Sequence, residues 1–273
     1  MPENYLLPLL LEARTLNEHL DADSLLIVDL CKPETYAQAH IPGAVFVDYA
    51  RIIHGVKPVL GLLPDLQRLS DLFSEIGLTA DTHVVAYDEE GGGRASRLLW
   101  TLEVLGHRRY SLLNGGLHAW VAERCPLSQA VPNITASAYT ATIADDAPLV
   151  DKAEVLAKLD SDDVRLLDAR SEAEYTGAKA YAARGGHIPG AIHFDWMGTF
   201  DKDRALRFRP EAELRNELEA AGLTPDKEII VYCQTHHRSS HSYIMLKWLG
   251  YKRVKGYAGA WAEWGNASDT PIE

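Results

Sequence analysis

Residues 228–238 of this 273-residue chain read Glu-Ile-Ile-Val-Tyr-Cys-Gln-Thr-His-His-Arg. The first five form an apolar, β-branched run typical of a buried strand, and a stretch with a helical pattern begins at Ser240. Cys233 therefore falls at the carboxyl end of a strand and beneath a helix N-terminus, where backbone N–H groups and the helix dipole favour negative charge. With Arg238 five residues further on, the pattern predicts a lowered thiol pKa and a cradle for an anion.

The composition limits the class of protein. With 47% hydrophobic and 24% charged residues, the chain is typical of a globular protein long enough for two domains. No apolar run approaches the ~20 residues that span a bilayer, and the N-terminus lacks a signal-peptide pattern, so we expect no membrane partner. The net charge of −12 argues against nucleic acid as a partner. Three scattered cysteines do not make a disulfide framework, so we expect a cytoplasmic protein in which Cys31 and Cys125 are inert.

The local charge around Cys233 differs from that of the whole chain. Residues 232–261 contain five basic residues and no Asp or Glu. This contrast predicts that the region around Cys233 attracts anions to an otherwise acidic protein. The five are Arg238, Lys247, Lys252, Arg253 and Lys255.

The chain contains two copies of one unit. A Tyr is followed by His-Ile-Pro-Gly-Ala in each copy, and the motif ends at Ala44 and again at Ala191, 147 residues later. Asp88 of the first copy aligns with Cys233 of the second, 145 residues later. So steady an offset indicates a duplicated domain rather than a solenoid, whose period is far shorter.

Each copy alternates short Val-, Ile- and Leu-rich runs with amphipathic stretches of helical length. This alternation predicts an α/β fold with two tandem domains, each a mostly parallel sheet flanked by helices. We expect a catalytically silent N-terminal domain at residues 1–124, a linker at 125–149 that is long enough to run across a domain surface, and a C-terminal catalytic domain at 150–273. The predicted strands are Leu25–Asp29, His83–Tyr87, Val164–Asp168 and Ile229–Tyr232, and the predicted helices are Asp65–Ile76, Ser96–Leu105, Glu211–Ala221 and Ser240–Leu249.

The two copies differ where chemistry is expected. Asp88 stands at the position of Cys233, and Glu89 and Glu90 follow it. An aspartate has no thiol chemistry, and the two glutamates repel an incoming anion. The first copy is therefore predicted to serve packing or to shape the cleft.

A second difference is an insertion in the second copy. Tyr175 and His187 lie twelve residues apart, whereas the matching pair in the first copy lies four apart. The insertion contains Lys179 and Arg184, and we expect it to bring one or two cations to the rim of the Cys233 pocket. A solvated surface loop is the open alternative.

The duplicated Asp…His-Ile-Pro-Gly-Ala pattern, the Cys-x4-Arg loop and the closing Gly-Ala-Trp-Ala-Glu-Trp-Gly at residues 259–265 resemble the tandem-domain rhodaneses, thiosulfate:cyanide sulfurtransferases. The resemblance covers nearly the whole chain, and the loop is similar to that of a bacterial subgroup typified by the Azotobacter rhodanese. It implies an enzyme that moves sulfur from thiosulfate to cyanide or a thiol through a persulfide on Cys233, with no metal or organic cofactor. The substrate-binding residues that it implies are Gln234, Thr235, His236, His237 and Arg238, to which we add Arg184 from the insertion.

The loop also departs from other members of that family. The better-known rhodaneses carry basic residues between the Cys and the Arg, and mercaptopyruvate sulfurtransferases carry Gly-Ser-Gly. A 3-mercaptopyruvate sulfurtransferase therefore stays an alternative, as does a persulfide carrier that serves an acceptor such as an iron–sulfur assembly protein.

Three other functions are less favoured. A cysteine phosphatase needs Cys-x5-Arg, and here Ser239 occupies the sixth place. A metal site is disfavoured, because adjacent histidines at the top of a loop seldom point at one ion. A binding module without chemistry fits the first copy but has no need of a charged thiol cradle in the second. The residues considered for the metal site are Cys233, His187, His236, His237 and His241.

Overall fold

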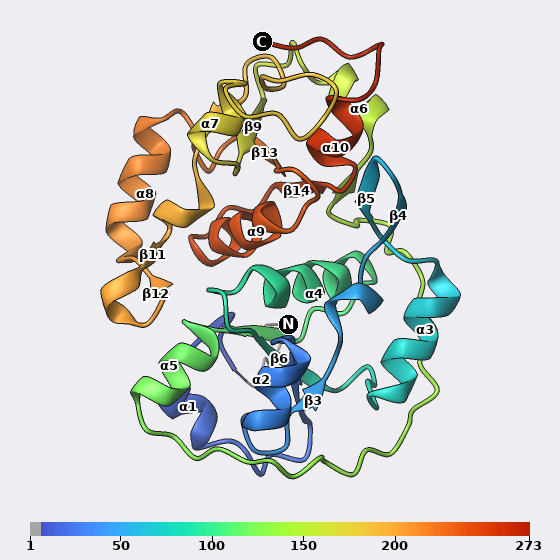
Figure 1. Cartoon of the computed structure of the whole chain (residues 1–273), viewed down its shortest axis with the longest axis vertical. Coiled ribbons are helices and arrows are strands. Elements are labelled where there is room, and N and C mark those ends of the chain that lie inside the picture. Colours follow the sequence, from blue (N-terminus) through green and yellow to red (C-terminus); the bar gives the residue numbers. More distant parts are fainter. Residues whose placement is uncertain (1–6) are drawn as a thin grey trace. The chain divides into compact units, whose positions relative to one another are not determined.

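The computed structural model describes residues 7–273, which form two compact units (Figure 1). Unit 1 consists of residues 7–52, 64–147 and 201–207, and unit 2 of residues 53–63, 148–200 and 208–273. Each unit thus contains one copy of the repeat and a short segment from the other copy. The N-terminal domain predicted at residues 1–124 begins outside the described part of the chain, since residues 1–6 are not described.

Unit 1 is built on a five-stranded sheet in which every pairing is parallel, with strand order β1-β7-β6-β2-β3. The predicted strands at residues 25–29 and 83–87 are present as β2 and β6. The strands are β1 (Leu10–Leu11), β2 (Leu25–Asp29), β3 (Val45–Phe46), β6 (His83–Tyr87) and β7 (Tyr110–Leu113). The helices are α1 (Ala13–Asn17), α2 (Pro33–Gln38), α3 (Leu66–Glu75), α4 (Gly93–Val104) and α5 (Gly116–Ala122), with a 3₁₀ turn at Tyr49–Arg51.

Unit 2 repeats this architecture with a parallel sheet of order β10-β9-β13-β14-β8. Matched strands of the two copies occupy matched places, so the predicted α/β fold with two mostly parallel sheets is confirmed. The strands are β8 (Leu149–Val150), β9 (Val164–Asp168), β10 (Ile192–His193), β13 (Glu228–Tyr232) and β14 (Val254–Tyr257). The helices are α6 (Lys152–Ala157), α7 (Glu172–Tyr175), α8 (Glu211–Ala220), α9 (Arg238–Trp248) and α10 (Ala260–Trp264), with a 3₁₀ turn at Trp196–Gly198.

Two short hairpins lie wholly or partly in the unit that is built on the other copy. The first pairs β4 (His54–Val56) with β5 (Val59–Leu62) and is part of unit 2. The second pairs β11 (Phe200–Asp201) with β12 (Arg207–Phe208) through a 3₁₀ turn at Lys202–Arg204, and residues 201–207 are part of unit 1. In unit 1, Arg207 forms an ion pair with Glu12 at 2.9 Å and a second one with Glu123. Within residues 7–273, no helix has the length and apolar character needed to cross a membrane.

The central strand of unit 2 is covered on both faces. Ile230 and Tyr232 of β13 pack in one apolar cluster with Trp261 and Trp264 of α10. Because side chains alternate along a strand, the residues between them face the other side, where α9 packs against β13 and β14. Figure 1 shows α9 and α10 on opposite sides of β14. A strand covered in this way delivers the residue after it, Cys233, to a fixed position.

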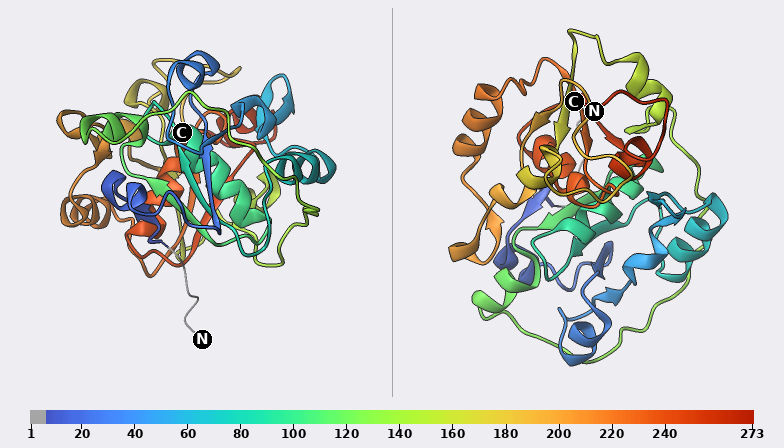
Figure 2. Two further views of the ribbon diagram at one scale, coloured as in Figure 1. Left: turned by 90° about the horizontal axis from the view of Figure 1, so that it is seen from below. Right: turned by 45° about the horizontal axis from the view of Figure 1, so that its top comes forward.

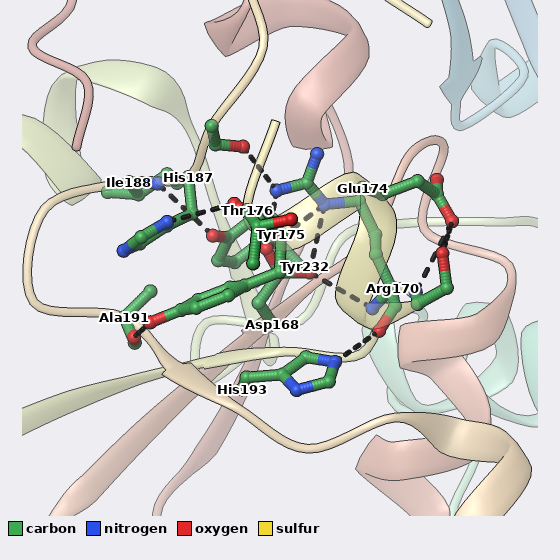
Figure 3. Close-up of polar contacts among 12 residues, drawn as sticks. Asp168, Arg170, Glu174, Tyr175, Thr176, His187, Ile188, Ala191, His193 and Tyr232 are labelled. Atoms are coloured by element: carbon green, nitrogen blue, oxygen red, sulfur yellow. Dashed lines mark hydrogen bonds and ion pairs between the residues drawn. The ribbon is translucent and has the colours of Figure 1, made fainter. Parts of the chain in front are cut away.

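The repeated Tyr…His-Ile-Pro-Gly-Ala motif is a structural clamp (Figure 3). The Tyr175 hydroxyl donates to the carbonyl of Ala191 at 2.8 Å, and the Tyr175 ring stacks on His187 with centroids 3.7 Å apart. The N–H of Ile188 donates to the hydroxyl of Tyr232, the last residue of β13, at 3.2 Å. The motif therefore ties a turn to the end of the central strand, a structural role that accounts for its presence in both copies. The matching residues in unit 1 are Tyr36, His40, Ala44, Ile41 and Tyr87.

The linker region, residues 125–147, contains no helix and runs as an extended segment (Figure 2). Its backbone is attached to unit 1 by several hydrogen bonds. Ser128 exchanges two hydrogen bonds with His40, at 2.8 and 2.9 Å, and the N–H of Ser137 and of Ala144 donate to the carbonyls of Ser74 and Val104. These contacts place the segment on the surface of unit 1.

Candidate active site

The loop that follows β13 surrounds the sulfur of Cys233 with donors. The Cys233 residue is 1% exposed. The backbone N–H groups of Thr235 and Ser239 donate to the sulfur, and so does the Ser239 hydroxyl. The helix α9 begins at Arg238, two residues before the predicted start at Ser240, so Arg238 and Ser239 belong to its first turn. The predicted position of Cys233, after a strand and beneath a helix, is the one observed.

The surroundings of Cys233 favour its thiolate. Burial by itself raises the pKa of this thiol, but the charge of Arg238, the Ser239 hydroxyl and the two N–H groups outweigh burial and lower the pKa. The other two cysteines behave in the opposite way. Burial and the Asp29 carboxylate raise the pKa of Cys31, and burial and Glu123 raise that of Cys125. Of the three cysteines, Cys233 is thus the one whose surroundings favour the thiolate.

His236 shapes the loop from inside. The residue is fully buried and has φ of +55°, a left-handed conformation that is costly for a non-glycine residue. His237 follows in the right-handed region, and this alternation turns successive N–H groups toward one side. The His236 Nδ1 lies 2.8 Å from the Ser239 hydroxyl oxygen. His236 therefore contacts the Ser239 hydroxyl, which in turn donates to the Cys233 sulfur.

Arg238 is held beside the sulfur by a carboxylate that the sequence reading missed. Its guanidinium donates to both oxygens of Glu174, at 2.7 and 2.8 Å. Burial lowers the pKa of Arg238, but the bonds to Glu174 and the charge of Cys233 raise it above the usual value. Burial raises the pKa of Glu174, yet its bonds to Arg238 and Ser171 lower it to about 2. Both groups are therefore charged near neutral pH.

The signal for Glu174 was present in the sequence as a capping box. Ser171 lies three residues before Glu174 at the start of α7, and each side chain bonds to the backbone of the other. That pattern predicts the helix start but not the partner of Glu174, because Arg238 lies 64 residues further along the chain.

The remaining loop residues have separate supports. The carbonyls of Cys233 and Gln234 accept hydrogen bonds from the N–H groups of Trp261 and Ala262, at 2.9 and 3.0 Å, in the first turn of α10. The Gln234 side chain donates to the carbonyl of Tyr181, in the insertion, at 3.4 Å. The His237 ring lies 6.0 Å from the ring of Trp196. Substrate binding by Gln234, Thr235, His236 and His237 stays a prediction.

Arg184 has other partners than those expected at the rim of the pocket. Its guanidinium donates to the carbonyls of Thr270 and Trp264, at 2.8 and 2.9 Å, and to that of Ala267. A planar guanidinium has several donors and can bind several carbonyl oxygens at once. These bonds hold the insertion against the C-terminal segment. Nothing among them supports substrate binding by Arg184, which stays a prediction.

Both copies of the repeat match the family model described as the rhodanese-like domain, at residues 12–123 and 151–267. The chain belongs to the rhodanese family. Proteins named thiosulfate sulfurtransferase from Azotobacter vinelandii and Pseudomonas aeruginosa are 48% and 47% identical to it over 267 residues, which cover 98% of this chain and 97% of each relative. The predicted membership in the Azotobacter-type rhodaneses is therefore confirmed.

The chain is also similar to two proteins with other names. The sulfur carrier protein TtuD of Thermus thermophilus is 34% identical over 93% of this chain and 93% of its own length. The crystal structure of an anaerobic ergothioneine biosynthesis enzyme from Chlorobium limicola, in complex with trimethyl histidine, has a TM-score of 0.87 at 26% identity, and the match covers 97% of this chain and 70% of that one.

Two of the five basic residues counted at residues 232–261 of this rhodanese are paired with acids from elsewhere in the chain. Arg253 pairs with Asp163 at 2.6 Å, and Lys255 pairs with Glu154 at 2.9 Å. Both acids lie outside residues 232–261, and folding brings them next to these bases. Arg238 is the member of the five whose charge acts on Cys233.

The histidines considered for a metal site have other contacts in this rhodanese. The Nδ1 of His187 lies 3.0 Å from the carbonyl oxygen of Tyr175. The His241 ring lies among aromatic side chains, with its centroid 4.7 Å from that of Phe208 and 5.6 Å from that of Trp196. In the described part of the chain, no group of three or more His, Cys, Asp and Glu side chains is arranged to hold a metal ion.

Proposed function

We propose that this rhodanese is a thiosulfate sulfurtransferase that carries the transferred sulfur as a persulfide on Cys233. The observation that carries this proposal is the setting of Cys233: a buried thiol that accepts hydrogen bonds from two N–H groups and a hydroxyl and lies near the charge of Arg238. The names of the two relatives at 48% and 47% identity favour thiosulfate as the donor. The lowered thiol pKa supplies the thiolate, which is the nucleophilic form of cysteine.

In the first step the Cys233 thiolate attacks the outer sulfur of thiosulfate. A sulfur–sulfur bond forms to Cys233, the sulfur–sulfur bond of thiosulfate breaks, and sulfite leaves with the electron pair. A thiolate and a dianion repel each other, so the approach needs local positive potential. Arg238 and the N–H groups of Thr235 and Ser239 supply it, and they are in place before the reaction begins.

In the second step a nucleophilic acceptor attacks the outer sulfur of the persulfide. The bond between the two sulfurs breaks, and the electron pair returns to Cys233 as a thiolate. Cyanide would leave as thiocyanate, and a thiol would leave as a new persulfide. The two steps balance without an outside oxidant, reductant or cofactor.

A second function uses the same site with a protein as acceptor. The likeness to a relative named as a sulfur carrier protein favours delivery of the persulfide to another protein, and an iron–sulfur assembly protein is one candidate acceptor. The donor 3-mercaptopyruvate stays an alternative to thiosulfate. A cytoplasmic location stays a prediction. It rests on the small number of cysteines, all three of which are free.

The test is intact-mass spectrometry after brief exposure to thiosulfate, followed by peptide mapping. We expect the mass of one sulfur atom to be added on Cys233 and to be removed by cyanide. The variant Cys233→Ser should gain none, whereas Cys31→Ser and Cys125→Ser should gain sulfur as the wild type does. If neither thiosulfate nor 3-mercaptopyruvate adds sulfur to Cys233, the proposal is wrong.

A further inference from the structure

The hairpin of β4 and β5 comes from the first copy of the repeat, yet it touches the Cys233 loop in unit 2. Its residue Gly61, in β5, is buried. A Cβ placed on Gly61 would lie 2.1 Å from the carbonyl oxygen of Thr235, 2.6 Å from its carbonyl carbon and 2.9 Å from its Cα. All three distances are shorter than a Cβ contact can be. The backbone of β5 therefore lies directly against the backbone of Thr235.

This close approach, and not the backbone conformation, is what requires glycine at position 61. Gly61 is not in the left-handed region, so its φ is open to any residue. Gly55 in the same hairpin is a useful contrast, because it has φ of +153° and its Cβ would meet the carbonyl oxygen of Val59 at 2.0 Å. Gly55 thus serves the hairpin itself, whereas Gly61 serves the contact with the loop.

The contact involves Thr235, one of the residues that donate a hydrogen bond to the Cys233 sulfur. The two residues before Thr235 are fixed by α10, through the bonds of Trp261 and Ala262 to the carbonyls of Cys233 and Gln234. The strand β5 also packs against α10. Thr235 lies next in the chain, and its N–H donates to the Cys233 sulfur. A shift of the Thr235 backbone would move one of the donors that favour the thiolate.

We propose that Gly61 is a positioning residue of the Cys233 loop, and that the hairpin of the first copy supports the N–H donor on which the reacting sulfur depends. The copy without chemistry thereby takes part in the chemistry of the other. The inference rests on the proposed function only in naming that sulfur as the reacting one.

The experiment compares Gly61→Ala with the wild type in the alkylation of Cys233 by iodoacetamide across a range of pH, with peptide mapping to follow this cysteine alone. The added methyl group pushes Thr235 away, so the midpoint of the profile should move to higher pH. For each unit of that shift, the rate at neutral pH should fall roughly tenfold. The rate of sulfur uptake from thiosulfate at saturation should fall in parallel. A folded Gly61→Ala protein with an unchanged alkylation profile would overturn the proposal.

A matched control is Gly198→Ala, also in unit 2. A Cβ at Gly198 meets nothing within 4 Å, and its φ is not left-handed, so alkylation should stay at the wild-type level. If Gly61→Ala does not fold, the double variant Val56→Gly with Val59→Gly decides the matter. These two residues pair across the hairpin, and their removal loosens β5 without adding an atom at Thr235. The midpoint should move in the same direction by a smaller amount, and no movement in this folded variant would equally overturn the proposal.

The two proposals fail separately, because alkylation uses no sulfur donor. A wild type that takes up no sulfur, together with a shifted profile in Gly61→Ala, would reject the proposed function and keep the positioning role. A wild type that forms the persulfide, together with an unchanged profile in Gly61→Ala, would do the reverse.

Discussion

In both loops, after β6 and after β13, backbone N–H groups donate to the side chain of the first loop residue. In unit 1 the Asp88 carboxyl group accepts hydrogen bonds from the N–H groups of Glu90, Gly92 and Ala95, at 2.9, 2.8 and 3.0 Å. In unit 2 the Cys233 sulfur accepts from the N–H of Thr235, which matches Glu90, and from Ser239. The anion cradle is therefore a property of the duplicated fold. In the first copy the Asp88 carboxyl group occupies the cradle, and in the second copy the Cys233 sulfur occupies it.

The charges around the two cradles differ. Arg238 is the first residue of α9, and Gly93, 145 residues earlier, is the first residue of α4. Burial and the neighbouring Glu90 raise the pKa of Asp88. Arg238 has the opposite effect on Cys233. We therefore expect the charge of Arg238 to distinguish the Cys233 loop, since in unit 1 the nearby Arg94 of α4 pairs with Glu90 at 3.4 Å.

The largest effect is expected from removing that cation. Arg238→Ala should raise the pKa of Cys233, because the favourable charge is lost while burial and the Glu174 carboxylate remain. An opposite charge at close range shifts a pKa by about 1–3 units, so the thiolate fraction at neutral pH should fall about tenfold to a thousandfold. The pH profile of alkylation and the rate of sulfur uptake measure this.

The double variant Arg238→Ala with Glu174→Ala is the control, since it removes the carboxylate left without its partner. It should recover part of the lost alkylation rate. An alkylation profile that is the same in Arg238→Ala as in the wild type would show that the N–H groups alone make the difference between the two loops.

The second effect concerns the carboxylate that holds the cation. The pKa of Glu174 is about 2 in the folded protein and near 4.5 when unfolded, so its ionised form stabilises the fold above pH 4.5, and this stability is lost as the pH falls toward 2. Glu174→Gln should therefore lower the free energy of unfolding at pH 7 by about 1–3 kcal/mol, a range reduced for the partial exposure of Arg238. Urea unfolding at pH 7 and at pH 3.5 should show a smaller difference at the lower pH.

Glu172→Gln is the matched control, because Glu172 is an exposed acid in the same helix α7. It should change the free energy of unfolding by much less than Glu174→Gln at pH 7. An equal cost of Glu174→Gln at both pH values would mean that shape, not charge, explains its role.

The sequence predicts the features that depend on residues close together in the chain, and it does not predict contacts between residues far apart in it. The strands, the duplication and the position of Cys233 follow from local period and repeated motifs, and the structure has them. The partner of Arg238 lies 64 residues away, and the support of Thr235 comes from Gly61 in the other copy, so no local pattern joins them.

Charge counts along the sequence fail for the same reason. The window around Cys233 held five bases, but the fold pairs Arg253 with Asp163 and Lys255 with Glu154, both from outside it. The Arg184 guanidinium binds carbonyls of the C-terminal segment, which periodicity does not reveal. The helices α4 and α9 begin at Gly93 and Arg238, before the residues 96 and 240 that the sequence predicts. The reason is that the first turn of each helix carries no apolar period.

The smallest effect on activity is expected at the silent loop. In Asp88→Ala the three N–H groups of Glu90, Gly92 and Ala95 lose a buried acceptor, so the free energy of unfolding should fall by about 1–3 kcal/mol. These hydrogen bonds all lie within residues 88–95. Sulfur uptake per folded molecule should therefore stay within about twofold of the wild type, since sites without shared partners act independently.

The double variant Asp88→Cys with Cys233→Ser asks whether the cradle alone suffices. It puts a thiol among the N–H groups of the first loop, but the adjacent carboxylates, Glu89 and Glu90, raise a thiol pKa and repel thiosulfate. Position 93 offers only a glycine where the second copy has Arg238. No sulfur should be added at residue 88. Sulfur found there by peptide mapping would mean that one side chain, and not the charge around it, separates the silent copy from the reactive one.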